Sequence, residues 1–234
     1  MINPTKTSCH HCPAQCLSIF QNLNESLLDE IKNIKTHQIF KKGDILFHQG
    51  SPSFGLYCIE SGSVKLFIQG DDGREIISQI ASAGDLIDVS SLFHAKDYQV
   101  SAKALGQVKC CFIEKTQIKE FTKKSEHINL NLFKLLEHNL IAANLRGNEL
   151  ILKNLKNRLA SYLVRMAPTS SPHHEIKFAP QLSREELAGY LGSAHETVIR
   201  CLTEFKDLGY IREENRTFYI LNPDKLYELS GENS

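Results

Sequence analysis

The chain has 234 residues, with 27 Lys and Arg balancing 27 Asp and Glu, so its formal net charge is zero. This length allows two modest domains, each with its own core. With no strong positive field, any affinity for nucleic acid must come from locally placed basic residues and from dimerisation. No signal peptide or membrane span is found, so we expect a soluble, cytoplasmic protein. Its seven cysteines then predict reduced thiols, metal ligands or redox sensors rather than a disulfide framework.

Residues 1–20 form a short polar segment that is rich in cysteine. Cys9, Cys12 and Cys16 lie close together in C-H-H-C-P-A-Q-C. Soft thiolates at this density suit an iron–sulfur cluster or zinc. A zinc site could be completed by His10, His11 or Cys111, and a C-x-x-C redox switch is a third alternative.

Residues 21–115 are expected to form a β-rich sensor domain. From about Ile39 to Glu114, short β-type runs such as L-Y-C-I-E-S-G-S-V-K-L-F-I alternate with glycine turns. This pattern predicts an antiparallel roll or barrel. Strand alternation places Cys110 and Cys111 on opposite faces, so only one of them can face the N-terminal segment. Cys58 is expected to be a small core residue.

Residues 116–152 show a helical pattern that predicts a long dimerisation helix. One apolar stripe has the alternating three- and four-residue spacing of a coiled-coil seam, and a second stripe follows another face. We assign the second stripe to packing on the roll and the seam to a symmetry-related helix. The seam comprises Phe133, Leu136, Leu140, Ala143, Gly147 and Leu150, and the second stripe comprises Ile128, Leu132, Leu135, Ala142 and Leu145.

Residues 153–234 are expected to form a DNA-binding domain. A helix over 154–166 and a loop over 168–174 precede two short helices between 183 and 209. Two capping-box spacings predict the starts of those helices, Ser183 with Glu186 and Ser193 with Glu196. Gly192 is expected to make the bend between the helices, and Gly209 to end the second one.

The second of these helices has the pattern of a recognition helix. Its inward stripe is expected to be Val198, Cys201, Leu202, Phe205 and Leu208, packed against Leu187 and Leu191 of the first helix. The opposite face presents His195, Glu196, Thr197 and Arg200 to the major groove. A turn at 214–216 between two β-type runs predicts the hairpin of a winged helix. The pattern therefore predicts a DNA-binding protein.

Four segments together resemble the CRP/FNR family of bacterial transcription regulators: K-G-D-I-L-F-H-Q-G, L-Y-C-I-E-S-G-S-V-K-L-F, G-D-L-I and E-T-V-I-R. The resemblance extends from about residue 39 to residue 221. It implies an α+β chain with a cyclic-nucleotide-binding-like β-roll (jelly roll), a long dimerisation helix and a C-terminal winged helix-turn-helix. It also implies a homodimer that binds a two-fold symmetric DNA operator, with RNA polymerase as a further partner. Because no catalytic motif is found, we do not expect an enzyme.

Cyclic-nucleotide binders of this family carry a G-E-L segment and an Arg-Ser pair that grips the cyclic phosphate. Here L-I-D-V-S-S-L follows Gly84 and Asp85, and the place of the Arg-Ser pair holds Tyr98 and Gln99. Neither residue supplies the fixed positive charge that a buried phosphate needs. We therefore do not expect a cyclic nucleotide as the effector.

The oxygen-sensing FNR branch holds a 4Fe–4S cluster with three N-terminal cysteines and a fourth at the end of the roll. The resemblance implies such a cluster on Cys9, Cys12, Cys16 and Cys111, with Cys110 or a histidine as the alternative fourth ligand. The spacing departs from that branch, because two and then three residues separate the N-terminal cysteines instead of two and then five. We expect oxygen, nitric oxide or redox state to act on this cluster and to repack the seam.

A haem-dependent alternative comes from L-I-L-K-N-L-K-N-R-L-A-S-Y-L, which resembles the nitric-oxide-responsive branch of the family. Haem needs an axial ligand such as histidine, and the candidates are His48, His94, His127 and His138. That branch does not require N-terminal cysteines, so the cysteine cluster favours iron–sulfur.

The resemblance also implies how DNA is contacted. Glu196 accepts from a cytosine amino group, Arg200 reaches guanine or phosphate, and His195 lies where specificity varies among relatives. Ile199 replaces a small residue that is often found there. Alternatively, Glu196 and Arg200 form a surface ion pair with no role in DNA binding. The expected phosphate contacts are Ser183, Ser193, Thr197 and Arg216. Cys201 is expected to be a buried core residue.

Overall fold

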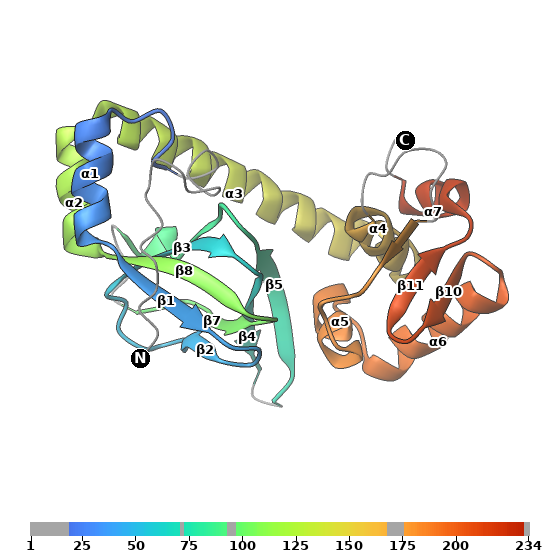
Figure 1. The fold of residues 1–234 in the computed structure, drawn as a ribbon. Helices are drawn as coiled ribbons and strands as arrows, with labels where there is room; N and C mark the ends of the chain where they lie inside the picture. Colours follow the sequence, from blue (N-terminus) through green and yellow to red (C-terminus); the bar gives the residue numbers. More distant parts are fainter. Residues whose placement is uncertain (1–18, 71–72, 93–96, 168–175, 232–234) are drawn as a thin grey trace. The chain divides into compact units, whose positions relative to one another are not determined.

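The computed structural model describes residues 19–70, 73–92, 97–167 and 176–231 (Figure 1). They form two compact units, one within residues 1–69 and 77–142 and the other within residues 70–76 and 143–234. None of the helices in these ranges is both long enough and apolar enough to span a bilayer.

The first unit is built on a β-roll of two four-stranded sheets, as the sequence predicts. One sheet has the order β1-β8-β3-β6 and the other β2-β7-β4-β5. The central strand β8 pairs antiparallel with both β1 and β3. The strands are β1 (Thr36–Phe40), β2 (Ile45–Phe47), β3 (Gly55–Ser61), β4 (Val64–Gln69), β5 (Glu75–Ala81), β6 (Leu86–Ile87), β7 (Ser101–Ala104) and β8 (Val108–Glu114), with a 3-10 helix at Val89–Leu92.

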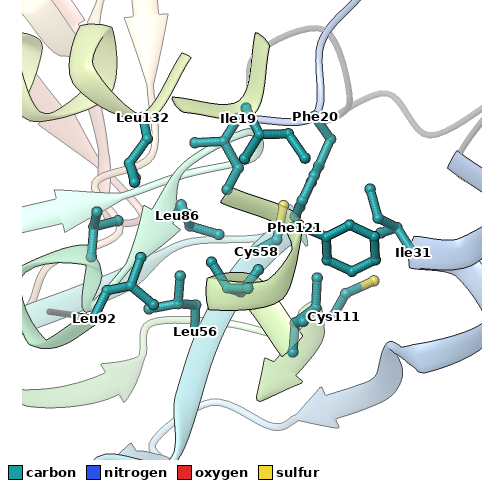
Figure 2. Close-up of a cluster of buried hydrophobic side chains, with 14 of the residues drawn as sticks. Ile19, Phe20, Ile31, Leu56, Cys58, Leu86, Leu92, Cys111, Phe121 and Leu132 are labelled. Carbon is teal, nitrogen blue, oxygen red and sulfur yellow. The ribbon is translucent and has the colours of Figure 1, made fainter. Parts of the chain in front are cut away.

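Side-chain alternation along β3 and β8 divides the roll between two cores. The inter-sheet core lies between the two sheets and contains Ile59, Val108 and Cys110. The helix-side core lies on the other face of the β1-β8-β3-β6 sheet and contains Cys58 and Cys111. Figure 2 shows both of these cysteines among the buried side chains of the helix-side core.

Helix α1 (Glu25–Ile34) precedes the roll and was not predicted from the sequence. Asn24 caps it, because its side-chain oxygen accepts a hydrogen bond from the Leu27 backbone N–H at 2.9 Å. Leu28 and Ile31 lie one turn apart on the inner face and are buried in the helix-side core. The roll therefore begins at Thr36, slightly before the expected start at Ile39.

The helical stretch expected over 116–152 is divided into α2 (Lys115–Lys124) and α3 (Glu126–Leu152). The division falls at Ser125, whose φ of −140° and ψ of 116° are extended. A residue in that conformation interrupts the helical hydrogen-bond ladder, so one continuous helix is not possible.

The second apolar stripe of α3 is confirmed over its first part only. Ile128 and Leu132 are buried in the helix-side core, and Leu135 packs against it. Ala142 and Leu145 are exposed, so their assignment to packing on the roll was wrong. The physical reason is the extent of this core, which reaches no further along α3 than Leu136 among the described residues.

The second unit contains four helices that follow α3, and a small sheet. The helices are α4 (Leu155–Met166), α5 (Arg184–Leu191), α6 (His195–Asp207) and α7 (Pro223–Ser230). The sheet has the order β10-β11-β9, from β9 (Ile176–Phe178), β10 (Ile211–Glu214) and β11 (Thr217–Ile220). The predicted α4 is confirmed, whereas β9 and α7 were not predicted. The expected loop at 168–174 lies outside the described residues.

Candidate functional site

The α5–turn–α6 motif is formed as predicted at its first helix. The Ser183 oxygen accepts from the Glu186 backbone N–H at 3.1 Å, and the Glu186 carboxylate accepts from the Ser183 N–H at 2.8 Å. This capping box fixes the start of α5. Gly192 then turns the chain with a left-handed φ of 61°. A Cβ at Gly192 would also lie 2.9 Å from Leu150 Cδ2, but that atom ends a flexible side chain, so the left-handed backbone is the stronger reason for glycine here.

The second predicted capping box is wrong. Ala194 is the N-cap of α6, and no side-chain cap hydrogen bond is formed there. Ser193 lies one residue too early, because its backbone N–H still bonds to the Ala188 oxygen at the end of α5. Each helix end needs hydrogen-bond partners for its unpaired backbone groups. In this short turn, Ser193 bonds to the C-terminal end of α5 and does not cap α6.

Helix α6 buries four of the five residues of the predicted stripe and exposes three of the four residues of the predicted polar face. Its buried residues are Val198, Cys201, Leu202 and Phe205. Leu208, which was expected in the same stripe, is 53% exposed because the helix has ended there and Gly209 takes a left-handed φ of 69°. His195, Glu196 and Arg200 are exposed. The first turns of α6 therefore present donors and acceptors to solvent on one side.

Arg200 is held on the exposed face of α6 without being neutralised. Its Nη2 lies 3.5 Å from Thr197 Oγ1, so a weak bond orients the guanidinium along the helix. An Arg200–Glu196 ion pair is not found among the residues that the structure describes. Glu213, by contrast, pairs with Arg184 and Lys206. The guanidinium of Arg200 thus remains available to an external acceptor.

The hairpin β10–β11 has the tight turn of a wing. Asn215 and Arg216 have φ values of 48° and 62°, the pattern of a two-residue type I′ turn. Arg216 is exposed at its tip, as are Ser183 at the start of α5 and the polar end of α6. Thr197 and Ser193 are half-buried. All the predicted contact residues therefore lie within one unit, and each is exposed or half-buried.

Most residues of the seam that is expected to form the dimer interface are exposed to solvent. Phe133 and Leu140 are 70% and 63% exposed, and Ala143 and Leu150 are exposed as well. Leu136 is half-buried because it also packs against the helix-side core. Gly147 is half-buried. Large apolar side chains left exposed along a helix are typical of a protein interface.

The cysteines at the end of the roll face in opposite directions, as strand alternation predicts. Cys111 belongs to the helix-side core, and Cys110 belongs to the inter-sheet core. Burial raises the pKa of the Cys110 thiol to about 12, with the neighbouring Cys111 adding to the effect. Cys58 and Cys201 are buried, as expected for core residues.

His37, Cys58 and Glu60 lie beside Cys111, and only Cys58 among them is identified from the sequence, as a core residue. His37 and Cys58 are its neighbours across β1 and β3 in the strand register. His37 Nδ1 lies 3.7 Å from Cys111 Sγ and 3.9 Å from Glu60 Oε2. Strand register brings these groups together, and the amino-acid pattern alone gives no signal for it.

The chain that follows the N-terminal cysteines enters the same core. Ile19 and Phe20 are buried there, close in sequence to Cys16 (Figure 2). The side-chain amide of Asn131, on α3, donates to the Ile19 oxygen at 3.1 Å and to the Gln21 oxygen at 3.0 Å. Cys9, Cys12 and Cys16 themselves, with His10 and His11, lie outside the described residues.

Known proteins match both units. Residues 37–125 match the cyclic nucleotide-binding domain family, and residues 157–229 match the Crp-like helix-turn-helix domain family. The transcriptional activator protein Anr of Pseudomonas aeruginosa is 30% identical over 87% of this chain and 83% of its own length. The chain belongs to the CRP/FNR family of transcription regulators. It is thus a DNA-binding regulator and not an enzyme, as predicted.

Two further similarities extend over most of this CRP/FNR chain. The transcriptional activator protein Anr of Pseudomonas protegens is 29% identical over 99% of this chain and 98% of its own length. The structure of FixK2 from Bradyrhizobium japonicum has a TM-score of 0.74 at 20% identity, covering 86% of this chain and 100% of its own. The predicted order of β-roll, long helix and winged helix-turn-helix is confirmed.

In this CRP/FNR chain, a carboxylate and a stacked ring lie where the effector of a cyclic-nucleotide binder would be sought. Asp88 follows the Gly84–Leu86 segment with a left-handed φ of 71°, and Ser53 Oγ donates to it at 2.5 Å. Burial raises the pKa of Asp88, while its bonds to Ser53 and Ser91 oppose that shift. Tyr98 stacks on Phe47 with ring centroids 3.8 Å apart. Neither side chain supplies a fixed positive charge, and the absence of a cyclic-nucleotide effector stays a prediction.

The haem alternative gains no support from the three of its four candidate histidines that are described. His48, His127 and His138 are all exposed, whereas haem sites depend on a pocket that controls polarity and access around an axial ligand. His94 lies outside the described residues.

Proposed function

We propose that this chain is a homodimeric transcription regulator controlled by an iron–sulfur cluster, 4Fe–4S in type, held by Cys9, Cys12, Cys16 and Cys111. One observation carries the proposal: Cys111 faces the same core that buries Ile19, the third residue after Cys16. Three residues of chain span at most about 11 Å. This short covalent connection supports Cys16 as a proposed ligand of the same cluster as Cys111.

Cys111 is a better fourth ligand for such a cluster than Cys110. Iron–sulfur clusters are bound by thiolates. The raised pKa of Cys110, about 12, disfavours its thiolate, and its side chain faces the inter-sheet core. The nearest described histidine, His37, lies beside Cys111 rather than in its place. When bound, the cluster would link the N-terminal segment to β8 through its thiolate ligands. Oxygen, nitric oxide or another oxidant would break this link.

Asn131 couples the position of the N-terminal segment to helix α3, which carries the dimerisation seam. Its amide holds the backbone oxygens of Ile19 and Gln21 from a buried position on α3. Phe133 of the proposed seam follows only two residues later. Movement of the N-terminal segment would therefore break or strain these two hydrogen bonds to α3, one of them buried, which costs free energy unless α3 moves with it. We infer that the seam repacks for this reason.

The exposed face of α6 carries the proposed DNA contacts. Glu196 would accept from a cytosine amino group, Arg200 would donate to guanine or phosphate, and His195 would tune the half-site. Ser183, Ser193, Thr197 and Arg216 would bind phosphate and position the helix. Two copies of the chain would read a two-fold symmetric operator, and RNA polymerase is the proposed further partner.

Replacing Arg200 with alanine should weaken specific DNA binding by about 10- to 100-fold, the cost of losing one base-reading arginine. Its exposed guanidinium bonds only weakly within the protein, so folding should be unaffected. Operator affinity measured by fluorescence anisotropy at one fixed salt concentration tests this. Lys225→Ala is the matched control, because Lys225 pairs with Glu228 on α7 and its loss removes the same charge. Equal binding by Arg200→Ala and wild-type protein would remove the recognition assignment.

The sensing half of the proposal is tested by purifying the wild-type protein without oxygen. We expect brown protein with visible thiolate-to-iron absorption, and with iron and acid-labile sulfide in equal amounts. A Soret band instead would identify haem. Colourless protein that contains zinc alone would favour a zinc or thiol switch and would reject the cluster.

A further inference from the structure

Cys111 and two neighbouring side chains, which lie on three adjacent strands, carry atoms of the kinds that ligate metals. His37 lies on β1, Cys111 on β8 and Glu60 on β3, and β8 pairs with both of the other strands. The pairing of β3 with β8 shifts register between Ile59 and Ser61, so Glu60 occupies an irregularity in the ladder. Such bulges commonly redirect a side chain next to a functional site.

The three ligand atoms of this group are close enough together for small side-chain movements to bring them onto one zinc ion. Zinc binds Cys sulfur at about 2.3 Å and His nitrogen or carboxylate oxygen at about 2.0–2.2 Å, in a tetrahedron. Ligand atoms in such a shell are about 3.3–3.8 Å apart. Here His37 Nδ1 is 3.7 Å from Cys111 Sγ and 3.9 Å from Glu60 Oε2. The three ligand atoms all lie within 4.8 Å of one another.

The surroundings favour a bound cation. The His37 and Glu60 side chains are only 11% and 14% exposed, and Cys111 is buried. His37 and Cys111 are paired in the strand register, and Glu60 lies between two paired residues of β3, so little backbone entropy is lost when the side chains converge on an ion. A thiolate and a carboxylate together supply two negative charges, which match a divalent cation.

We propose that Cys111, His37 and Glu60 form a mononuclear zinc site in the chain when it carries no iron–sulfur cluster. Binding replaces the thiol proton of Cys111, which passes to solvent, with a Zn–S bond. His37 donates its Nδ1 lone pair and Glu60 one carboxylate oxygen, and water takes the fourth position. The iron–sulfur cluster and the zinc ion would share Cys111, so one chain cannot hold both at once. Formation of either site does not depend on the other.

The site is tested in a full-length variant in which Cys9, Cys12 and Cys16 are replaced by serine, so that the N-terminal thiols cannot contribute. Cobalt(II) is titrated anaerobically as a coloured probe for zinc, and zinc is then added to displace it. We expect one cobalt per chain with a thiolate-to-metal absorption band, and displacement by one equivalent of zinc. Adding Cys111→Ser should abolish the band.

Single substitutions of His37 and Glu60 in the same triple-serine variant test whether these two residues bind the metal. His37→Ala and Glu60→Gln should each weaken zinc affinity by at least about 100-fold, since loss of a residue that only hydrogen-bonds to a metal ligand already costs up to that amount. His48→Ala and Cys110→Ser are matched controls that should bind normally, because His48 is exposed and Cys110 faces the inter-sheet core. Absence of a one-to-one complex, or unchanged affinity in both His37→Ala and Glu60→Gln, would overturn this site. Neither outcome bears on the iron content of the wild-type protein.

Discussion

Replacing Cys111 with serine should remove nearly all the iron from anaerobically purified protein, whereas replacing Cys110 should remove little. The hydroxyl of serine is a hard and poorly acidic donor, so it cannot take the place of a thiolate on iron. The two residues are adjacent in β8 and both buried, but they face different cores. Iron and sulfide analysis with visible absorption measures the difference directly.

This pair is informative because each variant controls for the other. Both remove one buried sulfur from the same strand, so a general loss of folding should affect both. A thermal melt on each variant checks that the roll remains folded. Loss of iron from Cys110→Ser, with normal iron in Cys111→Ser, would reverse the ligand assignment. Normal iron in both variants would exclude this end of the roll as a cluster ligand.

Replacing Phe133 with aspartate should convert the protein to a monomer at concentrations where the wild type is a dimer. Phe133 is 70% exposed in the single chain, and burying such a side chain contributes about 1.5–3 kcal/mol. Two-fold symmetry doubles that loss to about 3–6 kcal/mol, which weakens dimerisation by at least about 100-fold. Operator binding should fall with it, because a two-fold site needs both recognition helices.

Analytical ultracentrifugation over a dilution series gives the dimer affinity of this variant. His138→Asp is the matched control, because His138 is also exposed and lies about 140° around α3 from Phe133. It adds a carboxylate to the same helix away from the seam. If Phe133→Asp stays dimeric and binds operator as tightly as the control, the seam does not hold the dimer together.

Local signals in the sequence were enough for the helix-turn-helix and for much of the roll. The Ser183 capping box, the Gly192 turn and the buried stripe of α6 each depend on residues close together in the chain. The error at Ser193 arose because two helix ends compete for one short turn. Its serine–glutamate spacing is correct for a cap, but the end of α5 uses the Ser193 backbone N–H.

Properties that depend on tertiary contacts could not be predicted from the sequence. The pattern of α3 identifies two apolar faces, but the extent of the helix-side core decides which residues are covered, and it leaves Ala142 and Leu145 exposed. The alternation of side chains along a strand did predict that Cys110 and Cys111 face opposite sides of the sheet. The meeting of Cys111 with His37 and Glu60 depends on the register of three strands distant in sequence, which a single sequence does not encode locally.

The central claim, that the state of the N-terminal thiols controls a DNA-binding surface, is tested most directly by one titration. A single anaerobic preparation is exposed to measured amounts of oxygen, and its visible absorption and operator affinity are recorded on the same samples. We expect affinity to change in step with the loss of absorption, and the seam variant Phe133→Asp to show no such change. Operator affinity that stays constant while the absorption disappears would contradict the account.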